Sequence, residues 1–409
     1  MTVLTSGSGS YRPLEGYRVV DLTHYVAGPV ATQQLAELGA EVFKIEFGPG
    51  GDPTRTLPFS KGGTSAMFVQ HNRGKKSVCV DLRTPQGQQV VKELVRSSDV
   101  LVENYSPGVV GKFGLDYKSV QEINPRIIMC SLSSYGQTGP LSQSPGLDWV
   151  GGAWSGVLDL MGPADGAPMP VTFGMGDIAT GAHGASAIIG ALLFRERTGK
   201  GQYLDISLLD SYAYMLDSQV SNLTVTGSKF VPKRSGGRNE QLFPVGTFKA
   251  RDRYFVIMVC FDAHFVRLCE AMGQPELARD PRFATNADRV ENHEALTEII
   301  TSWLQSFSDS DDIAKLFVEA RVPAAPILTL KEAVAHPHLR ERGTYRKVHD
   351  PVLGDFDIPG MPFRSSLGVE AAALVAPRLG EHTQEVLKTV LGYDDQTVER
   401  LASEQVVIL

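Results

Sequence analysis

Two spacing patterns alternate along the chain from Tyr17 onward: compact apolar runs, and stretches whose apolar residues recur at helical spacing. The apolar runs predict strands over 17–23, 40–46, 77–82, 99–105 and 126–132. Helical spacing predicts helices over 31–39 and 85–97 and a short helical turn over 118–123. Strand and helix in turn indicate an α/β fold with a mostly parallel, Rossmann-like sheet. Ligands of such sheets gather at the carboxyl ends of strands, here the loops after Asp21, Glu46, Glu103 and Leu132.

The middle of the chain changes character. Residues 139–173 are rich in glycine, proline and serine and predict loops with a short helix, after which a long helix of small residues is expected over 177–198. A basic, glycine-bearing connection at 229–244 then opens a second set of strands and helices. We therefore expect a large domain over 12–228, a smaller α+β domain over 229–330, and a C-terminal part over 331–409 that returns to the large domain.

Charge and hydropathy narrow the function classes. The formal net charge is −7, which argues against nucleic acid as a partner and against binding to an anionic membrane surface. The longest apolar run, 185–194, is half of the roughly 20 residues that cross a bilayer. The amino-terminal segment lacks the pattern of a secretory signal, and the four cysteines have no C-x-x-C spacing. A cytoplasmic location is expected.

Several catalytic motifs are missing from the sequence. It contains no P-loop, no dinucleotide-binding G-x-G-x-x-G between strand and helix, no H-E-x-x-H and no G-x-S-x-G. His336 and His338 lie close together, but no third ligand is suggested nearby, so no metal site is expected.

Asp177 stands between glycines at the start of the expected long helix, and two interpretations remain open. It could be the helix N-cap, whose carboxylate accepts amide hydrogen bonds. It could also be a nucleophile that a substrate carbonyl approaches freely, because no bulky neighbour shields it. Lys75, Arg83 and Lys112 are either solvated surface residues or contacts for a phosphate-bearing ligand. Gly236 and Gly237 form either a hinge or a loop that closes over a ligand.

Taken together, ten ordered stretches resemble the family III CoA-transferases. They are Val20–Pro29, Leu38–Glu46, Gly51–Arg55, Asn72–Ser77, Val102–Gly108, Gly136–Pro140, Gly176–Asp177, Thr198–Gln202 and Leu379–Thr383, with the glycine pair at Gly236–Gly237. The resemblance covers the chain from about residue 14 to its end.

The resemblance implies a mechanism and a set of contacts. It makes Asp177 the nucleophile that attacks an acyl-CoA thioester, giving an aspartyl anhydride and then an aspartyl-CoA thioester. Coenzyme A is then a substrate, with no permanently bound cofactor, and the partners are an acyl-CoA donor and a carboxylic acid acceptor. The implied CoA contacts are Val26, Lys75, Val80, Leu82, Arg83, Asn104, Tyr105, Lys112 and Tyr135. Val26 and Gln137 are implied supporting residues, and Gly236 and Gly237 the loop that shields the anhydride from water. An interlocked homodimer is implied, or a heteromer with a homologous subunit.

Two departures and two rivals complete the picture. Formyl-CoA transferases carry glutamine where this chain has Val26 and arginine where it has Phe47, which favours a larger, more apolar acyl group here. Arg55, Arg234 and Arg238 could hold a dicarboxylate. A related α-methylacyl-CoA racemase needs histidine in a Gly-His-Asp stretch, where this chain has Leu147. A CoA-binding partner subunit is the non-enzymatic alternative.

Overall fold

The computed structural model describes residues 12–366 and 375–409, and contacts divide the chain into two compact units. Unit 1 takes the chain up to Val157, then Val171–Val220 and Pro337–Leu409; unit 2 takes Leu158–Pro170 and Ser221–His336. The boundaries differ from the predicted domains in three places. Residues 158–170 and 221–228 belong to unit 2, and the returning C-terminal part begins at Pro337 rather than at residue 331.

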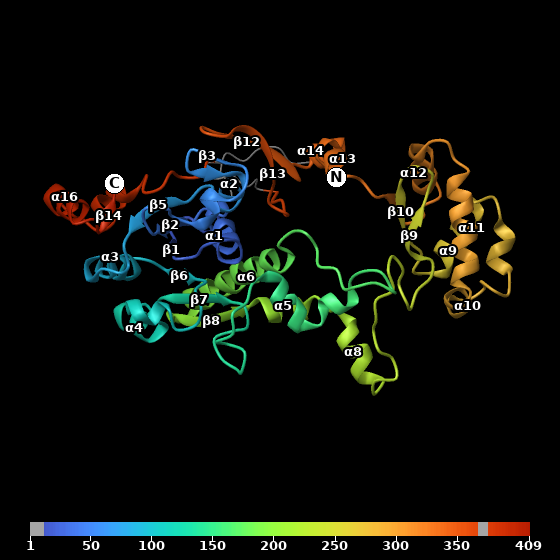
Figure 1. Ribbon diagram of the computed structural model, residues 1–409, viewed down its shortest axis with the longest axis horizontal. Helices are drawn as coiled ribbons and strands as arrows, with labels where there is room; N and C mark the ends of the chain where they lie inside the picture. The colour runs from blue at the N-terminus through green and yellow to red at the C-terminus, as the bar shows by residue number, and fades with distance from the viewer. Residues whose placement is uncertain (1–11, 367–374) are drawn as a thin grey trace. The chain divides into compact units, whose positions relative to one another are not determined.

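Unit 1 is built on a seven-stranded sheet (Figure 1) in the order β14-β5-β2-β1-β6-β7-β8. The strands are β1 (Arg18–Asp21), β2 (Glu41–Glu46), β5 (Lys76–Val80), β6 (Val100–Glu103), β7 (Ile128–Ser133), β8 (Gln202–Ser207) and β14 (Val407–Ile408). Every pairing from β5 to β8 is parallel, and β14 alone of these pairs antiparallel, to β5. This confirms the predicted α/β class with a mostly parallel sheet. The parallel strands run 3-2-1-4-5-6 in chain order, so the order reverses between β1 and β6, where such sheets bind ligands.

Helices cover both faces of this sheet because successive strand side chains point to opposite faces. On β1, Val20 packs into one hydrophobic cluster and Val19 into the other. The helices of unit 1 are α1 (Ala27–Glu37), α2 (Ala66–Asn72), α3 (Pro85–Arg96), α4 (Tyr117–Ile123), α5 (Asp148–Ser155), α6 (Met175–Thr198), α7 (Leu208–Tyr214), α14 (Pro337–Glu341), α15 (Thr383–Thr389) and α16 (Asp395–Ser403), with 3-10 turns η1 (Pro53–Thr56) and η2 (Val110–Phe113). Helices α3, α4, α15 and α16 share the cluster of Val20, whereas α1 and α6 share that of Val19.

Helix α6 is the one helix in the described ranges that is long and apolar enough to cross a membrane. Its side chains Ala185, Ile188 and Leu192 are buried in the same hydrophobic cluster as Leu35 of α1. That is the position of a core helix. It ends at Gly199, whose φ of +75° closes the last turn.

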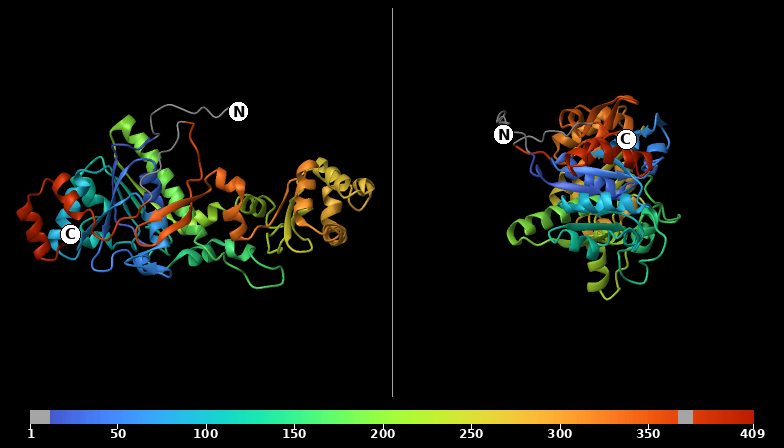
Figure 2. Two further views of the ribbon diagram at one scale, coloured as in Figure 1. Left: turned by 90° about the horizontal axis from the view of Figure 1, so that it is seen from above. Right: turned by 90° about the vertical axis from the view of Figure 1, so that its left-hand side faces the viewer.

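The C-terminal part of unit 1 completes the sheet. Figures 1 and 2 show the red end of the chain beside the blue amino-terminal strands. Val407 pairs with Val80, and the Cys79 amide donates to Thr383 Oγ1 over 3.0 Å. Two antiparallel hairpins also belong to this unit: β3 (Ser60–Lys61) with β4 (Thr64–Ser65), and β12 (Tyr345–Asp350) with β13 (Gly354–Pro359).

Unit 2 is a smaller α+β body with its own core. Its three-stranded sheet has the order β11-β10-β9 and is antiparallel throughout. Its elements are β9 (Val245–Lys249), β10 (Tyr254–Met258), α9 (Asp262–Ala271), η4 (Pro275–Arg279), α10 (Asn286–Glu291), α11 (His293–Gln305), α12 (Ser310–Glu319), β11 (Ala324–Pro326) and α13 (Leu330–Ala335), while η3 (Val157–Leu160) and α8 (Ser218–Val225) lie at the junctions between the units. Phe255 and Ile257 of β10 pack with Leu296 and Ile300 of α11.

Candidate active site

The loops after β1 and β6 meet at the reversal point of the sheet. The His24 amide donates to Asn104 Oδ1 over 2.9 Å, and Asn104 Nδ2 donates back to the His24 carbonyl oxygen over 2.8 Å. The next residue, Tyr25, has a φ of +65°, a left-handed conformation that costs a residue with a side chain about 1–3 kcal/mol. The β1–α1 loop is thus held by side-chain contacts in a conformation that it would not favour alone.

Two adjoining cavities open around this loop. The larger has a volume of about 750 Å³ and reaches Asp148 and Asp177; the smaller, about 430 Å³, reaches Phe47 and Arg83. His24, Tyr25 and Tyr105 line both. The loop is therefore a wall shared by both cavities, and the larger cavity contains the carboxylate pair.

Asp177 is the third residue of α6, not its N-cap. The helix begins at Met175 after Gly174, and its start has no side-chain capping bond. The N-cap interpretation of Asp177 is therefore wrong, because the helix starts two residues earlier than the apolar spacing indicated. The carboxyl group of Asp177 is left free of a capping role and lines the larger cavity.

A second carboxylate holds the start of α6. Asp148, the first residue of α5, accepts a hydrogen bond from the Asp177 amide over 3.2 Å and another from the Tyr212 hydroxyl over 2.8 Å. Gly176 makes this arrangement possible. A Cβ atom there would lie 2.1 Å from the Tyr212 ring and 2.3 Å from Asp148 Oδ1, so any other residue would displace the pair.

The electrostatics of this carboxylate pair favour protonation. Burial, followed by the charge of Asp148, raises the pKa of Asp177 to about 7. Burial also raises the pKa of Asp148, against the hydrogen bond from Tyr212. No lysine or arginine is among the described residues that line the larger cavity. A carboxylate that is poorly stabilised by its surroundings is a stronger nucleophile than a solvated one.

The cavities bring most of the expected CoA contacts together. Val26, Asn104, Tyr105 and Tyr135 line the larger cavity with Asp177. Val80, Leu82 and Arg83 line the smaller one, where the Arg83 guanidinium lies 4.2 Å from the centre of the Phe47 ring.

Other expected residues of the described chain lie outside both cavities. Lys75 is fully buried and pairs with Asp21 over 2.9 Å, and Lys112 is exposed on η2. The backbone amide of Gln137 donates to Asp205 Oδ2 over 2.9 Å. Gly236 and Gly237 belong to unit 2, where the Gly237 carbonyl accepts from the Thr247 amide.

The structure also changes the set of arginines expected to hold a dicarboxylate. Arg55 is 2% exposed and forms a two-point ion pair with Glu46, at 2.6 and 2.7 Å. Its guanidinium is committed to the protein interior, so the expectation that it holds a substrate is wrong. Arg234 pairs with Asp159 over 2.6 Å, and Arg238 forms no ion pair with the residues that the structure describes.

Sequence reasoning missed three residues of the site. Asp148 follows Leu147, the position at which a racemase would need histidine. A carboxylate at the start of a short helix was the signal that could have identified it. Tyr212 lies on an ordinary-looking helix, and its bond to Asp148 depends on the packing of α5, α6 and α7. His24 lies within the stretch Val20–Pro29, and nothing in its sequence context indicates that it lines both cavities. Across residues 12–366 and 375–409, no group of three or more His, Cys, Asp or Glu residues could hold a metal ion.

A mostly parallel sheet with a cavity at the point where its strand order reverses is typical of α/β enzymes, and this cavity contains the carboxylate pair Asp148 and Asp177. The family model for CoA-transferase family III matches residues 14–383. The chain therefore belongs to CoA-transferase family III and is a CoA-transferase that acts on acyl-CoA and carboxylic acids.

Individual proteins of this family are similar to the chain over almost its whole length. The chain is 38% identical to succinyl-CoA:glutarate CoA-transferase of Mus musculus over 98% of this chain and 92% of that protein. It is 35% identical to succinate–glutarate CoA-transferase of Agrobacterium fabrum over 96% and 98%. Among solved structures, a CAIB/BAIF family protein from Brucella suis matches with a TM-score of 0.81 and 36% identity, over 92% of this chain and 99% of that one.

Proposed function

We propose that this enzyme moves CoA from a dicarboxylic acyl-CoA, with succinyl-CoA as the reference donor, to a free dicarboxylate through covalent intermediates on Asp177. The observation that carries the mechanism is the placement of Asp177 in the larger cavity with a pKa raised to about 7 and no cation beside it. The substrate class is supported by the relatives named for succinyl-CoA and glutarate.

The reaction begins with attack by a carboxylate oxygen of Asp177 on the thioester carbonyl carbon. The carbon–sulfur bond breaks, CoA leaves as a thiolate, and a mixed anhydride remains. The thiolate then attacks the Asp177 carboxyl carbon, which releases the donor acid and leaves an aspartyl-CoA thioester. The acceptor carboxylate attacks that carbon, expels the thiolate and forms a second anhydride. The thiolate finally attacks the acceptor carbonyl carbon and restores Asp177.

Every step exchanges one acyl bond for another, so the thioester energy is retained without ATP and without a net proton. Asp148 keeps the Asp177 amide in place by a hydrogen bond and, through its charge, favours the neutral, acylated forms of Asp177. The anhydrides must be kept from water. That role stays with Gly236 and Gly237, on the strength of the family resemblance.

Chemical trapping tests the mechanism. The protein is incubated with succinyl-CoA, then treated with hydroxylamine or borohydride, and its peptides are analysed by mass spectrometry. We expect a modified Asp177, no modification without acyl-CoA, and none in Asp177→Ala. An unmodified Asp177 in a protein that transfers CoA would refute the covalent route. Deuterium exchange at C2 of a 2-methylacyl-CoA would instead indicate a racemase, and CoA binding without turnover a partner subunit.

Arg238 is the remaining arginine for a second substrate carboxylate, since Arg55 and Arg234 are paired within the protein. Kinetics with succinyl-CoA and with butyryl-CoA, before and after Arg238→Ala, test this assignment. We expect the KM for succinyl-CoA to rise about tenfold while that for butyryl-CoA stays the same. Equal effects on both donors would refute it. The homodimer and the cytoplasmic location remain predictions, which size-exclusion chromatography and cell fractionation test.

A further inference from the structure

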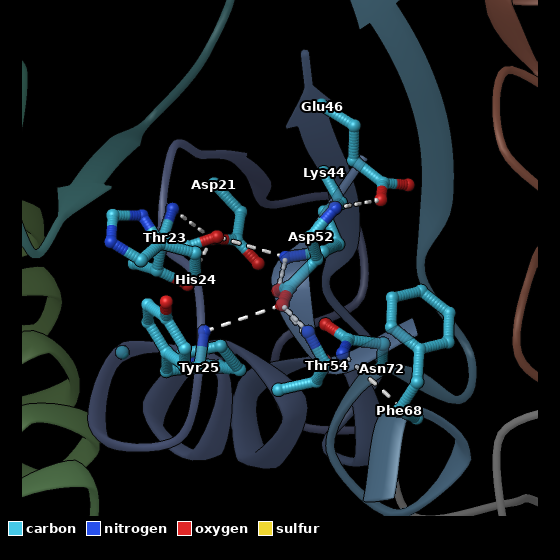
Figure 3. Close-up of polar contacts among 12 residues, drawn as sticks. Asp21, Thr23, His24, Tyr25, Lys44, Glu46, Asp52, Thr54, Phe68 and Asn72 are labelled. Atoms are coloured by element: carbon cyan, nitrogen blue, oxygen red, sulfur yellow. Dashed lines mark hydrogen bonds and ion pairs between the residues drawn. The ribbon is translucent and has the colours of Figure 1, made fainter. Parts of the chain in front are cut away.

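A buried group of charged side chains lies beneath the loop that separates the two cavities (Figure 3). It contains three carboxylates and three cations at the ends of β1, β2 and the segments beside them. Its members are Asp21, Lys44, Glu46, Asp52, Arg55 and Lys75, each no more than 3% exposed, and together they are called the ionic cluster below. Burying six charges costs desolvation free energy unless every charge is paired, so an apolar interior would be the simpler way to stabilise the fold.

The pairing within the ionic cluster is extensive. Lys44 pairs with Asp52 over 2.9 Å, Lys75 pairs with Asp21 over 2.9 Å, and Arg55 pairs with Glu46. Glu46 also accepts the Asp52 amide over 3.0 Å, which joins two of the three pairs. Thr23 links the third pair, because its carbonyl oxygen accepts from Lys44 and its amide donates to Asp21.

Three contacts run from the ionic cluster to the backbone of the β1–α1 loop. Lys44 Nζ donates to the Thr23 carbonyl oxygen over 2.9 Å, and Asp21 accepts from the Thr23 amide over 2.8 Å. Asp52 Oδ1 accepts from the Tyr25 amide over 3.4 Å, and Tyr25 is the residue in the left-handed conformation. In Figure 3, Lys44 and Asp52 lie beside the loop that carries Thr23 and Tyr25, and a dashed line joins the Tyr25 amide to Asp52. A strained backbone persists only where its surroundings over-determine it.

We propose that Asp52 is a positioning residue for acyl-CoA: it fixes the β1–α1 loop, and with it His24 and Tyr25, in the shape that forms the shared wall of both cavities. Asp52 is among the residues that line the smaller cavity, but its carboxylate oxygens are already engaged by Lys44, Thr54 and Tyr25. Its effect on the substrate therefore passes through the loop. This inference rests on the proposed function, because the ligand that the wall serves is an acyl-CoA.

The chain offers a control residue at the amino-terminal ends of the same parallel strands. Asp99, just before β6, pairs with buried Arg195 over 2.8 Å and accepts the Arg18 amide over 2.7 Å. Like Asp52, it joins a cation to a backbone amide, but it touches neither cavity in the described structure. Its side chain is 26% exposed against 0% for Asp52, so loss of its charge should cost less stability, and it makes no contact with the loop.

The test compares Asp52→Asn, Asp52→Ala and Asp99→Asn in the full-length protein. The dissociation constant of free CoA is measured by calorimetry well below each melting temperature, and hydrogen–deuterium exchange is followed in the peptide that covers 22–27. We expect at least a tenfold weaker CoA affinity in Asp52→Ala, a smaller loss in Asp52→Asn, and faster exchange of that peptide in both. Asp99→Asn should bind CoA as the wild type does, with unchanged exchange at 22–27.

Steady-state kinetics add a readout that a merely structural role would not move. In Asp52→Asn the KM for succinyl-CoA should rise about tenfold while kcat falls less than threefold, because the chemistry at Asp177 is untouched. Equal CoA affinity and equal exchange in Asp52→Asn and Asp99→Asn would overturn the positioning role and leave the proposed function intact. A wild-type protein that binds no CoA would overturn both.

Discussion

Two pairs of aspartates in unit 1 have opposite electrostatics. Asp177 and Asp148 line the larger cavity, and burial together with their mutual repulsion raises the pKa of Asp177 to about 7. Burial would also raise the pKa of Asp52, but Lys44 and the hydrogen bonds from Thr54 outweigh it and hold the pKa of that carboxyl at about 2. Asp21 likewise has its pKa lowered by Lys75 and Lys44 against the effect of burial. The presence of a paired cation, not the degree of burial, therefore separates the raised pKa of Asp177 from the lowered pKa values of Asp52 and Asp21.

The strongest test of this contrast is a pair of isosteric substitutions. Asp177→Asn should lower kcat by about 10⁴-fold or more, because the nucleophile is lost. It should not destabilise the fold. A raised native pKa means that the wild type loses stability as pH rises from about 4 to about 7, and the amide does not share that loss. Asp177→Asn should therefore be the more stable protein at pH 8, by about 1–2 kcal/mol, and equal at pH 4.

Thermal unfolding at the two pH values measures this difference, with Asp52→Asn as the counterpart. The pKa of Asp52 is lowered in the native protein, so the stability that its ionised carboxylate contributes is present above about pH 4 and is lost as pH falls towards 2. Asp52→Asn should thus be destabilised at pH 8. A similar loss of stability in both variants would break the contrast.

Removal of a cation from the ionic cluster should be the next largest effect. Lys44→Met leaves Asp52 buried without its cation, while Asp21 and Glu46 keep Lys75 and Arg55, and we expect the free energy of unfolding to fall by about 3–5 kcal/mol. Urea denaturation followed by circular dichroism provides the measurement. Lys76→Met is the control on the neighbouring strand. Lys76 is 32% exposed and pairs with Glu41 and Glu385, so its loss should cost no more than about 1 kcal/mol.

Gly176→Ala probes the packing that supports the reactive pair. The new methyl group would meet the Tyr212 ring and Asp148 Oδ1, so we expect a loss of about 1–3 kcal/mol in stability and a fall in kcat as Asp148 is displaced. Gly190→Ala, on the same helix α6, meets no atom within 4 Å and should be neutral or stabilising by up to about 1 kcal/mol. Similar results for both glycines would show that helix propensity, not the Tyr212 contact, decides the outcome.

The smallest expected effect is a shift of the pH profile. Asp148→Asn removes a negative charge that raises the pKa of Asp177 while it keeps an oxygen for the Tyr212 and Asp177 hydrogen bonds. The ionised nucleophile then persists to lower pH, so the acidic limb of kcat/KM should move down by about one unit. Asp210→Asn on α7, whose carboxylate bonds to Ser207 instead, should leave the limb in place. An unchanged limb in Asp148→Asn would assign the raised pKa to burial alone.

The sequence predicted the sheet well because its signal is local. The runs that became β1, β5, β6 and β7 are mainly apolar, as strands buried on both faces usually are, whereas β2 has Glu41, Lys44 and Glu46 among its apolar residues. The sequence did not predict elements that depend on partners far away in the chain. The strand β14 has only two residues and exists because β5 offers it an edge, and the hairpin of β12 and β13 is largely polar.

The site followed the same division. Asp177 could be singled out because glycines flank it, yet neither its place within the helix nor its raised pKa follows from spacing. Lys75 looked like a phosphate contact because lysines are usually solvated. The structure instead buries it against Asp21, a partner 54 residues away in the chain. Charge in a sequence does not reveal which cations the interior will take.

The antiparallel strand β14 has a consequence for the order of folding. Val407 lies 327 residues after Val80, its partner on β5. Until β14 has been made, the edge of β5 has unpaired amide and carbonyl groups, the kind of edge at which nascent sheets aggregate. All of unit 2 lies between these two strands in the chain, so it must be synthesised while that edge stays unpaired. The sheet of unit 1 is therefore completed late, after the smaller unit has been made.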